Sequence, residues 1–98
     1  MGVKSYDEFL LQQLRDPELA AEYLSATIED GTLADFLFAL RNVAEAQGGL
    51  GAVADATHLN RQTMYRTLSS EGNPTLSTLL TILRAVGLNL SFTPATPA

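Results

Sequence analysis

The sequence predicts an all-α fold of five to six helices that ends in one short β-strand. Apolar residues recur at i, i+3, i+4 and i+7 in several separate stretches, and this spacing gives an amphipathic helix one buried face. Residues 50–69 divide into two short helical patterns joined by a polar turn. Residues 88–92 (LNLSF) alternate apolar and polar side chains, which is typical of a half-buried strand. At 98 residues we expect a single domain with one core.

The N-terminal part of the chain predicts two helices. A short first helix covers residues 6–13. The second begins after Asp16, because Asp is a good helix cap and Pro17 is favoured at the first helical position. It stops near Gly31. Its apolar residues are Leu19, Ala20, Tyr23, Leu24 and Ile28.

A third helix is predicted between Thr32 and the glycine pair at residues 48–49. Thr32 and Asp35 have the spacing of a capping box, in which each residue satisfies a free backbone N–H of the other. The predicted core face of this helix is Phe36, Leu37, Leu40, Val43 and Ala44.

Residues 50–69 have the pattern of a helix-turn-helix, the two-helix unit that places its second helix in the major groove of DNA. Asn60 stands at the N-cap of the second helix. The first helix buries Leu50, Val53 and Ala54.

The second helix of this unit has two unlike sides. Met64, Thr67 and Leu68 point one way. At ~100° per residue, the polar side covers an arc of about 140°. It consists of Arg61, Gln62, Tyr65, Arg66 and Ser69. Because arginine and amide side chains suit the edges of guanine and adenine, this side predicts base reading.

Short polar groups flanking the second helix are expected to lie near DNA phosphates. These are Asn60, Thr63 and the backbone around Asn73. The full set of predicted DNA-binding residues is therefore Asn60, Arg61, Gln62, Thr63, Tyr65, Arg66, Ser69 and Asn73.

A last helix is predicted after the turn at residues 72–75, and it stops at Gly87. Its apolar residues are Leu76, Leu79, Leu80, Leu83 and Val86. The strand follows at residues 88–93, and we expect residues 94–98 to be a disordered tail.

The predicted strand has no obvious partner in a helical chain, and an isolated strand leaves its backbone N–H and C=O groups unpaired. We therefore expect it to pair with the same strand of a second copy in a homodimer. This pairing would bury Leu88, Leu90 and Phe92. The alternatives are pairing with the stretch near Val3–Tyr6, or a dimer held by a helix face.

Charge is unevenly distributed along the chain, whose net charge is −5. Residues 1–48, the acidic N-terminal helices, hold nine acidic and three basic residues. Residues 49–98 hold two acidic residues and three arginines, so residues 49–87 can approach phosphate. The acidic segment from Asp7 to Asp35 suits a basic partner. The alternative is that these acids only solvate helix exteriors.

Several classes of function lack support in the sequence. The chain has no cysteine and one histidine, so we expect no disulfide, no metal site and no cofactor. No carboxylate pair or Ser/His/Asp set accompanies a motif, so we expect no enzymatic activity. There is no apolar run long enough for a membrane span and no secretory leader, which predicts a cytoplasmic protein without a membrane partner.

The Gly-Asn-Pro-Thr turn and the helix after it resemble the Cro/lambda-repressor-like (XRE-type) class of helix-turn-helix domains. A closer resemblance covers residues 5–93. The segments at 23–31, 36–49 and 59–92 are similar to the addiction-module antidote family of small antitoxins, as is the short acidic N-terminus. His58 departs from this resemblance, because such turns usually carry a glycine with a positive φ at that position. His tolerates a positive φ better than most residues other than glycine, so we expect the turn to form with His58 in that conformation.

This resemblance implies a type II toxin–antitoxin function. The dimer would repress its own operon by binding operator DNA, and would neutralise a cognate toxin of the RelE/ParE type. Two alternatives remain. One is a stand-alone, prophage-type transcriptional regulator without a toxin partner, and the other is an interaction module whose helix-turn-helix is vestigial.

Overall fold

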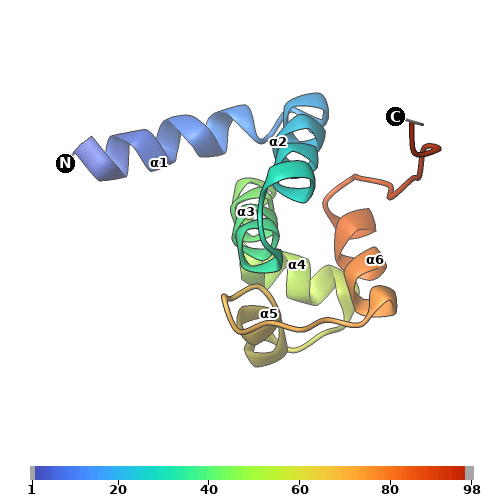
Figure 1. Ribbon diagram of the computed structural model, residues 1–98. Helices are drawn as coiled ribbons and strands as arrows, with labels where there is room; N and C mark the ends of the chain where they lie inside the picture. The colour runs from blue at the N-terminus through green and yellow to red at the C-terminus, as the bar shows by residue number, and fades with distance from the viewer. Residues whose placement is uncertain (1, 97–98) are drawn as a thin grey trace.

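The computed structural model describes the backbone of residues 2–96 and the side chains of residues 8–96. The predicted all-helical fold is confirmed, and the described part of the chain contains six helices and no strand (Figure 1). The helices are α1 (Gly2–Gln13), α2 (Pro17–Asp30), α3 (Leu33–Ala46), α4 (Leu50–Thr57), α5 (Arg61–Thr67) and α6 (Leu76–Ala85).

The predicted helix starts of α2 and α3 are confirmed. The Asp16 side chain accepts a hydrogen bond from the backbone N–H of Glu18 at 2.9 Å. At the start of α3, Thr32 Oγ1 accepts from the Asp35 N–H at 3.1 Å, and Asp35 accepts from the Thr32 N–H at 3.0 Å. These bonds satisfy backbone donors that a helix start leaves free. In contrast, α1 begins at Gly2, four residues earlier than predicted.

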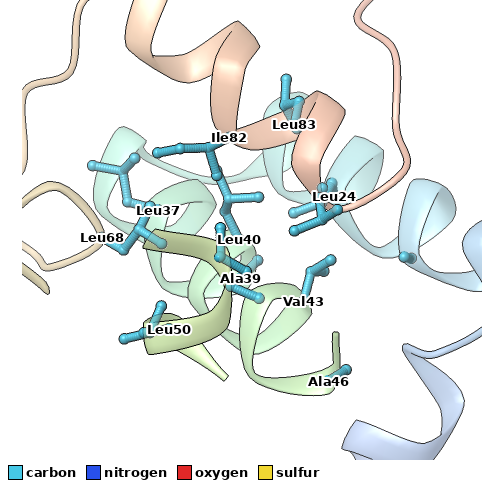
Figure 2. Packing of buried hydrophobic residues seen from close by; sticks show 14 of the residues in the cluster. Leu24, Leu37, Ala39, Leu40, Val43, Ala46, Leu50, Leu68, Ile82 and Leu83 are labelled. Atoms are coloured by element: carbon cyan, nitrogen blue, oxygen red, sulfur yellow. The ribbon is translucent and has the colours of Figure 1, made fainter. Parts of the chain in front are cut away.

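The core is built around α3, which contacts α1, α2 and α4, while α4 also contacts α5 and α6. All five residues of the predicted core face of α3 are buried. Side chains from α2, α4 and α6 converge on Leu40, together with Leu68 at the end of α5 (Figure 2). Thus α3 supports the short helices α4 and α5, which could not hold their shape alone.

Two helices bury a different set of apolar residues from the one predicted, and the prediction for α6 missed Ile82. In α6 the buried residues are Ile82, Leu83 and then Val86 at its end, whereas Leu76 is 58% exposed. In α2, Leu19 and Ile28 are also exposed. Both helices carry more apolar residues than the core can cover. The positions of apolar residues along each helix therefore do not by themselves identify which of them are buried.

The strand predicted at residues 88–93 does not form. Instead α6 ends in a Schellman motif at Gly87, whose φ is 85°. The Gly87 N–H donates to the Arg84 carbonyl at 3.0 Å, and the Leu88 N–H donates to the Leu83 carbonyl at 2.9 Å. Leu88 then packs against the core of its own chain. A strand at this position also has no partner near Val3–Tyr6, because those residues belong to α1.

Residues 89–96 follow without regular secondary structure, and their side chains are exposed. Phe92 is 86% exposed, the largest value among the large apolar side chains described. The predicted disordered tail extends to residues 97–98, which lie outside the described part of the chain.

Candidate nucleic-acid interface

Helices α4 and α5 form a compact pair joined by a short turn. Buried residues hold the pair against the core: Leu50, Val53 and Ala54 on α4, and Met64 and Leu68 on or beside α5. His58 ends α4 with φ 63° and ψ 17°, in the left-handed region. The predicted positive φ at His58 is therefore confirmed, and it turns the chain between the two helices.

Side-chain hydrogen bonds brace this turn. Thr57 Oγ1 donates to the Val53 carbonyl at 2.9 Å and accepts from the Leu59 N–H at 3.4 Å. Asn60 Oδ1 accepts from the Thr63 N–H at 2.6 Å, which confirms Asn60 as the N-cap of α5. The start and direction of α5 are thus set by both flanking residues and the core.

The predicted division into an inner and an outer side is confirmed for α5 itself, whereas Ser69, predicted on the outer side, lies beyond the helix and is half-buried. Met64 and Leu68 are fully buried, while Arg61, Gln62 and Arg66 are exposed. Tyr65 is 47% exposed. Thr63 is half-buried, and its backbone N–H is already bonded to Asn60.

Arg61 lies back against α4. A Cβ atom added to Gly51 would come within 3.0 Å of the Arg61 Cζ and Nη2 atoms. The guanidinium therefore occupies space that exists because residue 51 has no side chain. This contact joins the exposed side of α5 to the first turn of α4.

Tyr65 lies beneath a cation from a third helix. The Cζ atom of Arg41, on α3, stands 5.6 Å from the centre of the Tyr65 ring, within the range of a cation–π interaction. Arg41 is not among the predicted DNA-binding residues. It is the single cation between Arg15 and Arg61, but nothing in that position along the sequence places it beside α5.

The two remaining predicted residues lie in the segment after α5. The Ser69 hydroxyl donates to the Arg66 carbonyl at 2.7 Å and accepts from the Glu71 N–H at 3.3 Å. These bonds shape the turn. Asn73 is exposed and follows Gly72, where a Cβ would overlap the Thr67 carbonyl oxygen. The path of the backbone at Asn73 therefore depends on glycine at position 72.

The opposite end of the molecule has a different surface. Figure 1 shows α1 and α2 at one end and α5 at the other. Every acidic side chain described in the first three helices and the loops between them is exposed; the side chain of Asp7 lies outside the described residues. These acids are Glu8, Asp16, Glu18, Glu22, Glu29, Asp30, Asp35 and Glu45.

Two open hollows flank α2. One, of about 440 Å³, lies between α2 and α3, where Asp30 and Asp35 accompany the exposed ring of Phe38. The other, of about 360 Å³, is lined mainly by apolar side chains and lies between α2, α6 and residues 88–91. Among the residues described, no three His, Asp or Glu side chains gather as a metal site would require, and no helix is long and apolar enough to cross a membrane.

Comparison with known proteins identifies a family. A family model described as "probable addiction module antidote protein" matches residues 3–94. The chain is also similar to an uncharacterized protein of Haemophilus influenzae, with 29% identity over 90 residues that cover 92% of this chain and 88% of that protein. No solved structure matches.

Proposed function

The chain belongs to the family of probable addiction module antidotes, and on that premise we propose that it is a type II antitoxin that also represses its own operon. The antitoxin role follows from the family. The repressor role rests on the surface of α5, and we assign α4 and α5 to an XRE-type helix-turn-helix. Both activities are binding functions exercised in the cytoplasm, and neither requires catalysis.

The observation that supports DNA binding is the outward face of α5. Arg61, Gln62, Tyr65 and Arg66 lie on the side away from buried Met64 and Leu68. With α5 in the major groove, Gln62 can pair with an adenine edge and Arg66 with a guanine edge, each through two hydrogen bonds. Asn60 and the backbone at Asn73 flank this face and would approach phosphates.

We further propose that the operator is bound by a homodimer. A two-fold dimer places two recognition helices about 34 Å apart, one turn of DNA, as a palindromic operator requires. The C-terminal segment supports this arrangement, because residues 88–96 carry no charge and expose Leu90 and Phe92. Since Leu88 already packs against its own core, we assign the contact between copies to Leu90 and Phe92.

The proposed toxin partner is a basic protein of the RelE/ParE type. Exposed carboxylates of α2, such as Glu18, Glu22 and Glu29, give this end of the antitoxin a negative potential that would speed encounter with a basic surface. Exposed apolar side chains of α1 and α2, including Phe9 and Ile28, could be covered in the complex. A bound basic toxin would also add positive charge near the operator, so the complex should bind DNA more tightly than the antitoxin alone.

Co-expression with a neighbouring gene tests the antitoxin role. A small basic reading frame beside this gene should arrest growth when expressed alone, and co-expression of the antitoxin should restore growth. The two purified proteins should also co-elute. A catalytically inactivated toxin serves as the control for growth arrest.

The outcome separates the proposed function from its alternatives. Operator binding without any toxic or co-eluting neighbour would identify a stand-alone regulator. Toxin neutralisation without operator binding would leave an interaction module whose helix-turn-helix is vestigial.

A further inference from the structure

We propose that Arg41 is a positioning residue of the DNA-binding surface, which holds the Tyr65 ring in place on α5. The proposal rests on the proposed operator binding by α5. It adds a residue from α3, a helix outside the α4–α5 pair, to the set on which DNA recognition depends.

Arg41 and Tyr65 are in direct contact. The Arg41 guanidinium carbon lies 5.6 Å from the Tyr65 ring centre, and attraction between a cation and an aromatic face is significant within about 6 Å. Arg41 is half-buried, so water screens the interaction less than it would between two fully exposed side chains. Tyr65 is the one aromatic side chain on the exposed face of α5.

The part of α3 that carries Arg41 is firmly packed. Its neighbours Leu40 and Val43 are fully buried in the core. The Asn42 side chain donates to the Tyr23 hydroxyl at 2.9 Å, which fixes this part of α3 to α2. Because the backbone at Arg41 cannot shift easily, its guanidinium restricts where the Tyr65 ring can lie.

Holding the Tyr65 ring in place before binding reduces the conformational entropy that is lost on binding DNA. An exposed tyrosine loses side-chain freedom when it is ordered against DNA. A ring already held by Arg41 has lost part of that freedom before DNA arrives. Arg41 therefore favours binding through Tyr65, and its contribution should disappear when the ring is removed.

A double-mutant cycle measures this dependence. The variants are Arg41→Gln, Tyr65→Leu and the double variant, and the readout is affinity for the operator at fixed salt. Arg41→Gln should lower affinity about two- to fivefold when Tyr65 is present. It should have little further effect on Tyr65→Leu. An equal loss in both backgrounds would overturn the proposal, because Arg41 would then act independently of the ring.

Two controls separate positioning from loss of charge or stability. Arg84→Gln makes the same charge change at an exposed position on α6, and it should leave the affinity within experimental error. Tyr65→Phe keeps the ring, so the Arg41→Gln effect should persist in that background. Urea unfolding of each variant should give similar midpoints.

A measurement without DNA keeps this proposal distinct from the proposed function. In the free protein, the ring current of Tyr65 should shift the side-chain NMR signals of Arg41 upfield, and Tyr65→Leu should abolish the shift. Absence of the shift in the wild type overturns the inference. Failure of the wild type to prefer any operator would overturn the proposed function.

Discussion

The α5 end and the α1–α2 end of this molecule differ in how their exposed side chains are supported. On α5, Arg61 lies against Gly51 and Tyr65 lies under Arg41, so each contacts another helix. On α2, Glu18 and Glu22 are simply exposed. The difference indicates that the positions of exposed side chains on α5 depend on how the helices pack. The exposed face of α2, in contrast, is distinguished mainly by its negative charge.

The two ends also show why net charge is a poor guide to partners. The whole chain carries −5, yet the side chains grouped on and beside α5 include Arg41, Arg61 and Arg66. Most of the acids lie on or beside α1 and α2, at the end of the molecule opposite α5 (Figure 1). An acidic protein can therefore carry a locally basic face.

The two ends should differ most in how far a single substitution lowers the free energy of unfolding. Met64→Ala removes a fully buried side chain that anchors α5, and it should lower the free energy of unfolding by about 2–5 kcal/mol. Ile28→Ala, at a position that is 62% exposed on α2, should change it by about 0.5 kcal/mol or less. Urea unfolding measures both. Equal losses would show that the α2 surface is as tightly supported as α5.

The second prediction concerns the proposed dimer, which would place two copies of the α5 surface in one assembly. Leu90→Ser combined with Phe92→Ser should yield a monomer by sedimentation, while leaving Leu88 in the core. Operator affinity should then fall about 100-fold, because two linked binding surfaces gain that much over one. Leu76→Ser, another exposed apolar position, is the control. If the double variant stays dimeric, a helix face must hold the copies together.

The third prediction tests the assignment of charge to the α2 surface. Converting Glu18, Glu22 and Glu29 to Gln should slow toxin association at low salt by about tenfold, because electrostatic steering is lost. Stopped-flow kinetics at two salt concentrations would measure it. The same variant should retain the unfolding midpoint of the wild type. An unchanged association rate would indicate that the toxin binds elsewhere on the antitoxin.

The smallest expected effect comes from Gly51→Ala. Alanine in place of glycine inside a helix should raise the free energy of unfolding by up to about 1 kcal/mol. The new Cβ would also displace the Arg61 guanidinium, a flexible group that can move. A variant that is more stable yet has altered operator affinity would tie Arg61 to binding. A variant that is more stable and has unchanged operator affinity would show that the position of Arg61 against α4 does not affect DNA binding.

Local chemistry made much of the fold predictable. The caps at Asp16, Thr32 and Asn60 and the positive φ at His58 depend on residues close in sequence, and all four were predicted correctly. The inner and outer sides of α5 were likewise predictable, because apolar and polar residues alternate there with a clear helical period.

Features that depend on contacts between distant segments were not predictable. Residues 88–92 have a strand-like pattern, but a strand needs a partner, and Leu88 instead completes the cap of α6. In α6, nearly every apolar position could have faced inward, and Leu76 does not. Arg41 meets Tyr65 across 24 residues of sequence through packing that no short motif encodes.

The central claim is that the exposed face of α5 reads operator DNA. The most direct test is titration of the duplex upstream of this gene, and of a scrambled duplex, with the wild type and the Gln62→Ala, Arg66→Ala double variant. The wild type should prefer the upstream duplex by about 10³-fold or more. The double variant should lose at least about tenfold of that affinity and much of the preference, since each base-reading pair contributes about 1–3 kcal/mol. Unchanged affinity and preference in a folded double variant would contradict the account.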